Sequence, residues 1–295
     1  MILTVALILD AIFGEPRWLW SRVTHPAVVM GRAVSALDRQ LNDRTRRCGV
    51  LAVCVLVAGA AAIGCALTVL PPLMQAVAAA MLLAQKSLTQ HVTAVASGLA
   101  QGLEPGRQAV AMIVGRDTAQ LDEAAIARAA IESGAENLSD GVVAPAFWLL
   151  IAGLPGLMVY KAVNTADSMI GYRTEAYRNF GWAAARLDDL LNLVPARLTG
   201  AMIALASGGI AAWSIMRSDA PRHRSPNAGW PEAAMAATLG VRLSGPRHYA
   251  EGPSQDPWLN EGARDPNIED VTKAVSVMWR VWWVLLTIAA MLWLL

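Results

Sequence analysis

Long uncharged hydrophobic runs alternate with polar segments along this chain. The run at 49–70, as a helix, is long enough to cross a hydrocarbon core of about 30 Å. A shorter run follows a Pro-Pro pair at 72–85, and two further runs cover 198–216 and 275–295. The pattern predicts an all-α, polytopic helical membrane protein. We expect the first two runs to form a helical hairpin; one span followed by a surface helix is the alternative.

A fifth hydrophobic run, at 142–160, contains helix breakers. Pro145, Gly153, Pro155 and Gly156 interrupt it, as happens in re-entrant or discontinuous membrane helices that line a cavity. We therefore predict a re-entrant or broken segment here rather than a plain span.

The polar segments between the runs have simpler patterns. Residues 86–132 are predicted to form two helices joined by a turn at Glu104-Pro-Gly106. Residues 217–274 are rich in Pro, Gly, Asn and Arg and are expected to form a polar loop region with one short helix near 231–239. No internal repeat divides the chain, so we expect a single integral membrane domain over 1–295.

Composition agrees with a membrane protein. Hydrophobic residues make up 55% of the chain and charged residues 16%, which is more apolar material than one soluble core needs. Four tryptophans crowd the last run, as expected at membrane interfaces. A net charge of +1, with no Lys/Arg block interleaved with aromatic residues, argues against a nucleic-acid partner. The N-terminus lacks a signal-peptide pattern, and the predicted location is a bacterial cytoplasmic membrane.

Carboxylates gather beside the broken run. Glu132, Glu136 and Asp140 are spaced by four residues, which would place them on one face of a continuing helix, with Asn137 among them. Three like charges within two turns repel one another unless water, a cation or arginines neutralise them. A solvated helix face is the alternative interpretation.

Two further motifs pair carboxylates with amides. Asn164 and Asp167 are three residues apart, and Asp188-Asp189-Leu-Leu-Asn192 places two carboxylates and an amide within about one turn. Hard oxygen ligands of this kind suit Mg²⁺ that holds a phosphate. Ionisable side chains next to hydrocarbon are costly and usually functional, although helix capping is the alternative role for each motif.

Basic residues flank these acids and are expected to contact phosphate oxygens or, alternatively, lipid headgroups: Lys161, Arg173, Arg186 and Arg197. Arg116 is either a phosphate ligand or half of a local ion pair with Asp117. His25 is either structural or a proton acceptor. The sequence contains no P-loop and no nucleophile elbow, so any nucleotide is held in another way.

The motifs, taken in order, resemble the adenosylcobinamide-phosphate synthases of cobalamin biosynthesis, the CobD/CbiB family. The matching segments cover most of the chain and include Asp10-Ala-Ile-Phe-Gly-Glu-Pro16, His25-Pro26, Gly115-Arg-Asp-Thr118, Glu136-Asn-Leu-Ser-Asp-Gly141, Tyr160-Lys161, Asn164-Thr165, Asp167-Ser-Met169, Ala185-Arg186, Asp188-Asp189, Asn192, Pro195-Ala-Arg-Leu198 and Ser225-Pro-Asn227.

The resemblance implies an ATP- and Mg²⁺-dependent amide ligase. It would join a propionate carboxylate of adenosylcobyric acid to the amine of (R)-1-aminopropan-2-ol or its O-phosphate. The implied metal ligands are Asp167, Asp188, Asp189 and Asn192; the substrate- and phosphate-binding residues are Arg116, Asn137, Asp140, Asn164, Arg173, Arg186 and Arg197; and the catalytic residues are Glu132, Glu136, His25 and Lys161. The expected partners are these corrinoid and amino-alcohol substrates, the lipid bilayer and other membrane enzymes of late cobalamin synthesis.

Topology adds a constraint, because ATP is cytoplasmic and the active site must face that side of the inner membrane. Four simple spans would put 132–141 and 161–197 on opposite faces. A hairpin at 49–84 and a re-entrant segment at 142–160 would instead keep 10–48, 86–141 and 161–197 together.

Two other functions fit parts of the sequence. A non-catalytic membrane sensor of the AmpE type would keep the fold but not need the acids. An intramembrane prenyltransferase of the UbiA type has paired motifs like those at 164–167 and 188–192, but it needs more spans than this chain offers.

Overall fold

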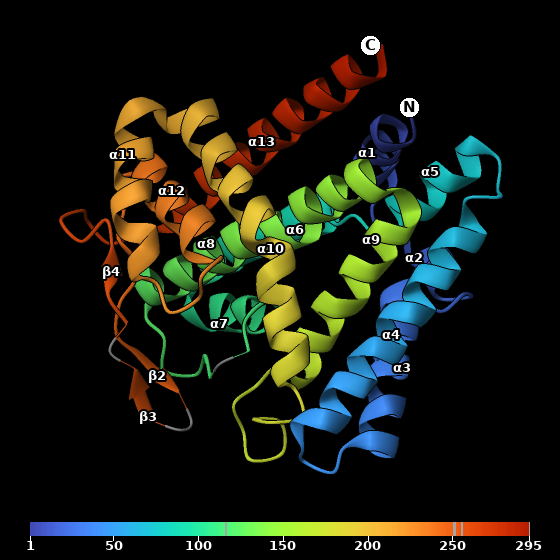
Figure 1. The fold of residues 1–295 in the computed structure, drawn as a ribbon. Helices are drawn as coiled ribbons and strands as arrows, with labels where there is room; N and C mark the ends of the chain where they lie inside the picture. The colour runs from blue at the N-terminus through green and yellow to red at the C-terminus, as the bar shows by residue number, and fades with distance from the viewer. Residues whose placement is uncertain (116, 250–251, 255, 295) are drawn as a thin grey trace. The chain divides into compact units, whose positions relative to one another are not determined.

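The computed structural model describes residues 1–115, 117–249, 252–254 and 256–294 (Figure 1). Its helices are α1 (Ile2–Phe13), α2 (Arg17–Trp20), α3 (Pro26–Leu41), α4 (Arg46–Leu67), α5 (Pro72–Ala80), α6 (Gln85–Gln101), α7 (Leu103–Ala111), α8 (Glu123–Leu138), α9 (Ala144–Ile170), α10 (Trp182–Ile203), α11 (Gly209–Asp219), α12 (Gly229–Leu239) and α13 (Ile268–Leu294). Shorter turns are η1 (Ser139–Val143), η2 (Ala204–Gly208) and η3 (Ala220–Arg222), and the strands are β1 (Leu243–Ser244), β2 (Arg247–Tyr249), β3 (Gly252–Ser254) and β4 (Trp258–Leu259).

Four helical stretches in the described chain are long and apolar enough to cross a membrane: Arg46–Leu67, Glu123–Ile170, Trp182–Ser207 and Ile268–Leu294. They confirm the predicted all-α, multi-pass architecture. The predicted segment at 72–85 is not among them, because α5 has nine residues and a helix of that length extends only about 14 Å.

The predicted span at 198–216 has the wrong boundaries. Helix α10 already begins at Trp182, and the helical path is interrupted by the π-helical turn η2 and by Gly209, which has a φ of 64°. The hydropathy pattern predicted that a polar segment extends to residue 197, yet α10 itself contains charged residues. They are accommodated because their side chains have partners within the fold.

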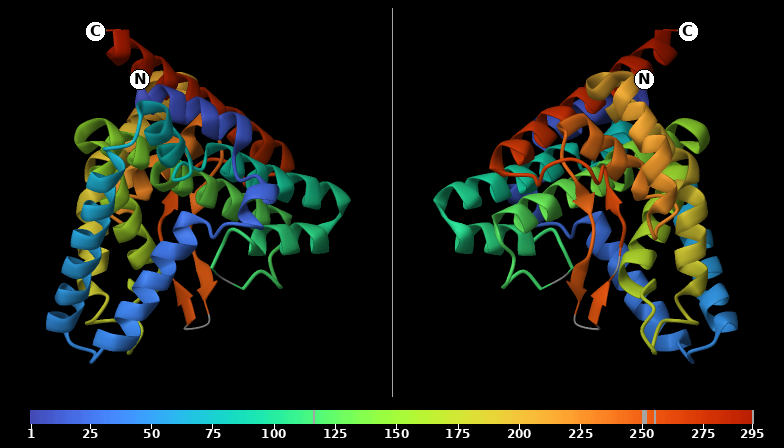
Figure 2. Two further views of the ribbon diagram at one scale, coloured as in Figure 1. Left: turned by 90° about the vertical axis from the view of Figure 1, so that its right-hand side faces the viewer. Right: turned by 90° about the vertical axis from the view of Figure 1, so that its left-hand side faces the viewer.

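The chain divides into two compact units. Unit 1 contains residues 1–84, 140–193 and 292–295, and unit 2 contains 85–139 and 194–291. In unit 1, α1 packs on α5, and α4 packs on both α3 and α9 (Figure 2). A Cβ atom added at Gly49 would overlap the carbonyl oxygen of Phe180, and one at Gly64 would overlap Pro155. Glycine therefore permits close backbone contact at both positions.

Helix α9 contains the break that the sequence predicted. Ala152 and Gly153 have non-helical backbone angles, with a φ of 62° at Gly153, and Pro155 follows. The Tyr160 hydroxyl donates a hydrogen bond to the carbonyl of Asp140 at 3.2 Å, whereas 20 residues of straight helix would separate these residues by about 30 Å. Residues 140–160 thus form a helical hairpin, which confirms the predicted fold-back.

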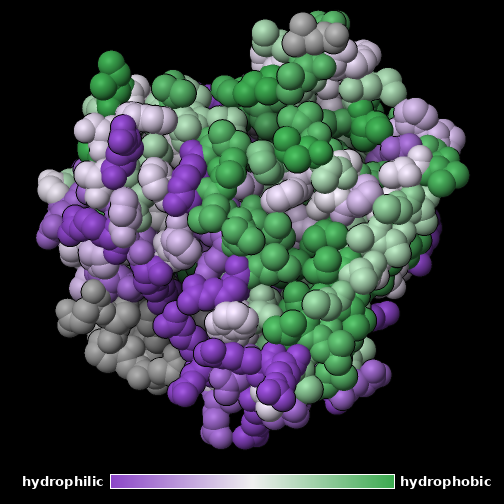
Figure 3. All heavy atoms as spheres, viewed as in Figure 1, coloured by the Kyte–Doolittle hydropathy of each residue, from purple (hydrophilic) through white to green (hydrophobic). Residues whose placement is uncertain are grey.

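Apolar side chains cover the outside of unit 1. On α4, Val50, Leu51, Val55 and Ile63 are each between 43% and 54% exposed, as expected for a face that meets lipid. In Figure 3 hydrophobic atoms spread over the region of α4 and α9, whereas hydrophilic atoms gather around residues 171–181, the connection from α9 to α10. The hydrophobic surface therefore ends at this connection.

In unit 2, α6 and α7 run side by side and both pack on α8 (Figure 2). Their connection is Gly102, with a φ of 139°, so the turn predicted at 104–106 is wrong: those residues lie in the first turn of α7, where proline is tolerated because its missing N–H has no helical partner. The short helix expected near 231–239 is α12. Strand β1 pairs antiparallel with β4, and β2 with β3.

An ion-pair cluster holds Arg242 and Asp265 of unit 2 against α8. Asp265 pairs with Arg128 of α8 and with Arg242, at 2.7 Å for the latter. The two guanidinium groups each lie over the Trp258 ring, at 4.7 and 4.6 Å from its centroid. The hydrogen bond from Arg242 is the largest cause that lowers the pKa of Asp265 to about 2.

Candidate active site

A cluster of carboxylates and amides forms in unit 1 where the 140–160 hairpin meets α10. The buried Tyr160 hydroxyl bonds to the Asp140 carbonyl and also donates to Oδ1 of Asn192 at 3.0 Å. The hairpin thereby brings residue 140 next to the second half of α9 and next to α10.

Asn164 links the two carboxylates of this cluster. Its Nδ2 lies 3.4 Å from Oδ2 of Asp140 and 3.3 Å from Oδ1 of Asp188. Asn192 donates to the other oxygen of Asp188 at 3.0 Å. Asp188 and Asn192 are buried, and burial of a carboxylate is tolerated when hydrogen bonds replace its water.

Lys161 supplies the positive charge of the cluster. Asp140, Asp188 and Glu15 all attract its ammonium group. A buried carboxylate without such a cation would be strongly destabilising. The acid–amide cluster is therefore a polar site in which the Lys161 ammonium partly offsets the negative charge of the two aspartates.

His25 lies next to this cluster but has a structural partner. Its Nδ1 accepts the backbone N–H of Ala27 at 3.1 Å and so caps α3, and its ring packs edge-on against Trp20. Burial lowers the pKa of His25; Glu15 opposes this and the Lys161 charge adds to it. In the neutral ring, the acceptor nitrogen Nδ1 is thus engaged by the backbone of α3.

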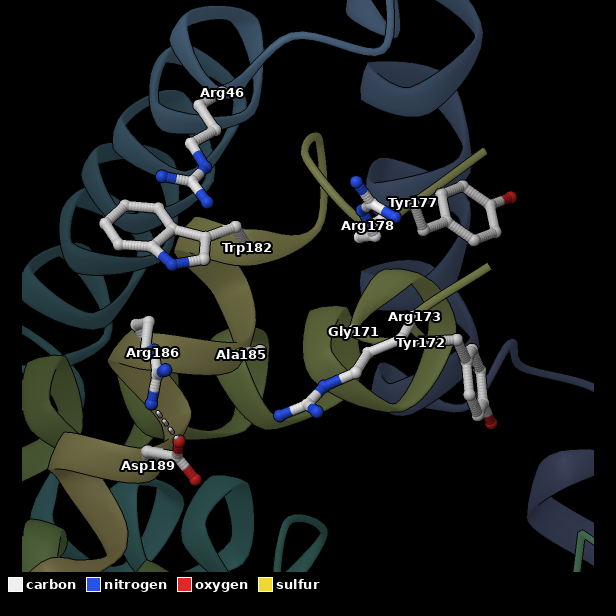
Figure 4. A pocket seen from close by; sticks show the side chains of 10 residues that line it. All are labelled: Arg46, Gly171, Tyr172, Arg173, Tyr177, Arg178, Trp182, Ala185, Arg186 and Asp189. Carbon is white, nitrogen blue, oxygen red and sulfur yellow. Dashed lines mark hydrogen bonds and ion pairs between the residues drawn. The ribbon is translucent and has the colours of Figure 1, made fainter. Parts of the chain in front are cut away.

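A second feature of unit 1 is a pocket of about 340 Å³ at the start of α4 and α10. We call it the arginine pocket; its lining residues, drawn in Figure 4, are Arg46, Gly171, Tyr172, Arg173, Tyr177, Arg178, Trp182, Ala185, Arg186 and Asp189. The predicted phosphate-binding residues Arg173 and Arg186 both line it. Arg46 and Arg178 also line it, although the sequence did not single them out.

Contacts within the arginine pocket fix several of these groups. The Arg46 guanidinium lies 5.1 Å from the centre of the Trp182 ring, and Arg186 pairs with Asp189 at 3.5 Å. Figure 4 shows Arg173 extending toward this pair, and both arginines attract the Asp189 carboxylate. The pocket keeps a large excess of positive charge.

The connection 171–181 is tied to the turn between α3 and α4. Tyr177 donates to Asp38 at 3.2 Å, and burial, followed by the Asp38 charge, raises the pKa of Tyr177. Asn42 donates to the carbonyl of Ala176 at 3.5 Å, and Arg44 pairs with Glu175 at 3.2 Å. These contacts anchor the connection at residues 175–177, between its pocket-lining residues Arg173 and Arg178.

Several predicted site residues lie elsewhere. Glu132 is buried in unit 2 and accepts the backbone N–H of Ser244 at 2.6 Å, so it anchors β1. Glu136 and Asn137 are exposed in unit 2. The guanidinium of Arg197 lies over the Trp230 ring of unit 2. Arg116 lies outside the described residues.

Glu132, Glu136 and Asp140 therefore do not share one environment, because Glu132 is buried and Glu136 is exposed. Asp140 lies within a π-helical turn, Ser139–Val143, that follows α8, and not on the continuing α-helix that the spacing assumed. Asp140 joins the cluster in unit 1, whereas Glu132 is engaged by β1.

The four predicted metal ligands do not gather as one set either. Asp188 and Asn192 belong to the acid–amide cluster, Asp189 lines the arginine pocket, and Asp167 lies against Gly171 at the end of α9. Within the described part of the chain, no group of three or more His, Cys, Asp or Glu side chains is arranged to hold a metal.

Asp140 and Asp188 nevertheless fit Mg²⁺ that is bound together with a phosphate. Both approach the same Asn164 amide. Mg²⁺ is commonly held by one or two carboxylates, with phosphate oxygens and water completing its shell. The pair of hard oxygen donors is compatible with this arrangement, and Asp140 replaces Asp167 and Asp189 in it.

Comparisons with known proteins show the family of the chain. The model of the CobD/Cbib protein family matches residues 3–278. Relatives named "Cobalamin biosynthesis protein CobD" from Rhizobium meliloti (strain 1021) and Brucella suis biovar 1 (strain 1330) are 50% and 48% identical, in each case over 95% of this chain and 92% of theirs. A relative of the same name from Rhodobacter capsulatus is 49% identical over 93% of this chain and 91% of its own. No solved structure matches the chain.

Proposed function

Because this chain belongs to the CobD/CbiB family, we propose that it is a membrane enzyme of cobalamin biosynthesis. It uses ATP to join a propionate carboxylate of adenosylcobyric acid to the amine of (R)-1-aminopropan-2-ol or its O-phosphate. The observation that carries the proposal is the acid–amide cluster with its lysine, which shares α10 with the arginine pocket in unit 1.

The reaction proceeds in two steps. A carboxylate oxygen of the corrinoid attacks the γ-phosphorus of ATP; the bond to the bridging oxygen breaks and ADP leaves. The amine nitrogen then attacks the carbonyl carbon of the acyl phosphate, inorganic phosphate leaves, and the nitrogen gives up a proton. Activation of this kind is needed because a carboxylate at neutral pH is a poor acyl donor.

The residues of the cluster have distinct roles in these steps. Lys161 offsets negative charge on the carboxylate and on the transferred phosphoryl group. Asp140, which is less buried than Asp188, accepts the amine proton. Mg²⁺ held by Asp140 and Asp188 would neutralise phosphate charge. His25 caps α3 and Glu132 anchors β1, so both residues support the fold around the site.

We place this site on the cytoplasmic side of a bacterial inner membrane, where ATP is available. The acids and Lys161 favour an enzyme over a non-catalytic sensor, since a sensor has no use for a buried carboxylate that is costly to maintain. The four candidate spans of the described chain are too few for a UbiA-type prenyltransferase.

The test is an assay of the purified full-length protein in detergent with Mg·ATP. ADP should accumulate only when adenosylcobyric acid and an amino alcohol are both present, and mass spectrometry should detect adenosylcobinamide or its phosphate. Parallel reactions with the free and the phosphorylated amine identify the preferred substrate. A folded protein that is silent with both amines would favour the non-catalytic function.

A further inference from the structure

We infer that the arginine pocket binds the polyphosphate chain of the nucleoside triphosphate, and that Arg46 and Arg178 are phosphate-binding residues in addition to Arg173 and Arg186. The inference rests on the proposed use of ATP. It goes further by identifying where the nucleotide is held in a chain that has no P-loop, and by assigning two residues that lie far apart in the sequence.

Charge favours a polyphosphate over a single phosphate ester. Four arginines and one aspartate line the pocket, which leaves an excess of three positive charges. A phosphate monoester carries about −1.5 to −2 charge and offers three oxygens, and an arginine can engage two of them at once. Four guanidinium groups exceed what one phosphate can use, whereas a triphosphate can engage all of them.

The shape of the pocket suits the rest of a nucleotide. Its volume of about 340 Å³ falls in the range of small-ligand sites. Tyr172 lines it and is 59% exposed, so an aromatic face is available for a base to stack on. Helices α4 and α10 both begin at the pocket, and their positive dipole ends also attract phosphate.

The phosphate-binding groups are held in place before a ligand arrives. Arg173 and Arg178 lie on the connection that Asp38, Asn42 and Arg44 anchor to the α3–α4 turn. Arg46 is fixed by its contact with Trp182. Preorganised donors lose less conformational freedom on binding and therefore bind more tightly.

Helix α10 connects the pocket to the reacting groups. Asp189 lines the arginine pocket, and its sequence neighbour Asp188 belongs to the acid–amide cluster. A triphosphate in the pocket therefore has its terminal phosphate within reach of the cluster, which is where the corrinoid carboxylate must attack.

The experiment measures binding of ATP, ADP, inorganic tripolyphosphate and inorganic phosphate to the full-length protein by calorimetry, without corrinoid. The variants are Arg46→Gln, Arg178→Gln and Arg46→Lys. The matched control is Arg47→Gln, which removes the same charge from an exposed neighbour that does not line the pocket. Size-exclusion profiles and near-ultraviolet circular dichroism establish that each variant is folded.

We expect Arg46→Gln and Arg178→Gln to weaken binding of ATP and tripolyphosphate about tenfold or more. Arg46→Lys should recover part of this loss, and Arg47→Gln should change the affinity for either ligand by less than about twofold. Unchanged ATP binding in both glutamine variants would overturn the inference. A raised KM for aminopropanol phosphate alone would assign the pocket to the amine substrate and would also overturn the inference. Lost capture by phosphatidylglycerol vesicles with normal ATP binding would assign the pocket to a lipid headgroup, with the same consequence.

Failure of this inference is distinguishable from failure of the proposed function. Ligase activity that survives in Arg46→Gln and Arg178→Gln with an unchanged KM for ATP removes the pocket assignment and leaves the function standing. Arginine-dependent ATP binding in a protein that makes no amide product with either amine removes the ligase and leaves the nucleotide site standing.

Discussion

Both carboxylate oxygens of Asp188 accept amide N–H groups, one from Asn164 and one from Asn192. These bonds hold the carboxylate in one orientation beside Asp140, which also approaches the Asn164 amide. Asparagine is nearly isosteric with aspartate, so a substitution at this position removes the charge with little change in volume. It also places an amide N–H group against one of the two donors and therefore removes one hydrogen bond.

We predict that Asp188→Asn lowers kcat by at least about 100-fold, as is typical when a group that stabilises charge in the transition state is lost, while the protein still purifies as a folded species. The measurement is steady-state ligase kinetics at saturating Mg·ATP. Asp43→Asn, which changes an exposed carboxylate at the α3–α4 turn, is the control and should keep normal turnover. Normal kcat in Asp188→Asn would exclude this carboxylate from the reaction.

His25 predicts a pH dependence of stability. Burial is the chief reason why the pKa of His25 in the folded protein lies below its usual value of about 6.5, so the unfolded chain takes up a proton on His25 at a higher pH than the folded protein does. The contribution of His25 to the free energy of unfolding is therefore constant above about pH 6.5, and it becomes unfavourable to folding as the pH falls below that value. His25→Asn keeps a capping side chain and removes the titration.

The measurement is the Tm of both proteins in detergent between pH 7.5 and 5. The Tm of the parent should fall more steeply below about pH 6.5 than that of His25→Asn, and the two slopes should agree above it. Parallel curves over the whole range would contradict the prediction that His25 is held neutral.

At the scale of elements, hydrophobic runs predicted the existence of the long helices but not their ends. Helix α10 begins 16 residues before the predicted run at 198, because Asp188 and Asn192 find partners in the fold that a hydropathy pattern does not contain. The break in α9 was predictable, since Gly153 and Pro155 mark it in the sequence.

The site was predictable in its composition but not in its assembly. Asp140, Asn164 and Asp188 are recognisable as candidates from their residue types, yet only the hairpin brings them together. Arg46 and Arg178 could not be singled out, because an arginine at a helix end has the same sequence pattern whether it meets a headgroup or lines a pocket. The partner of Glu132 could not be predicted, because the backbone N–H of Ser244 lies 112 positions further along the chain.

The break in α9 depends on glycine. Gly153 has a φ of 62°, a conformation that costs a residue with a Cβ atom about 1–2 kcal/mol. Gly153→Ala should therefore lower the free energy of unfolding by about 1 kcal/mol. Gly59→Ala is the matched control: Gly59 lies within α4 with nothing near its missing Cβ, and alanine should stabilise the helix by about 0.5–1 kcal/mol. Reversible unfolding in mixed micelles measures both; equal shifts would exclude a special role for Gly153.

At the scale of the whole molecule, the arginine pocket constrains topology. It joins the start of α4 with the end of α9 and the start of α10 within unit 1, and we therefore expect these three helix ends to lie on one side of the membrane. The predicted grouping of 10–48, 86–141 and 161–197 on that side stays a prediction. Residue 69 lies beyond the opposite end of α4, whose 22 residues span about 33 Å.

We predict that single cysteines at positions 47 and 175, in a chain whose three native cysteines are replaced, react with a membrane-impermeant maleimide only after cells are permeabilised. Both positions are exposed, and Val69, which is 86% exposed, supplies the control: a cysteine there should react in intact cells. Labelling of 47 and 175 from opposite sides would contradict the shared helix ends.

The turn at 152–153 also affects how the chain enters the membrane during synthesis. The translocon reads local hydrophobicity, and the Glu123–Ile170 stretch contains a window apolar enough to be inserted as an ordinary crossing. An extra crossing there would reverse the side on which every later segment emerges. Closure of the hairpin at Gly153 before α10 is inserted would thus determine the orientation of the later helices. A variant that slows hairpin closure would yield two populations of intact molecules, and in one of them α10 and α13 would have the opposite orientation across the membrane.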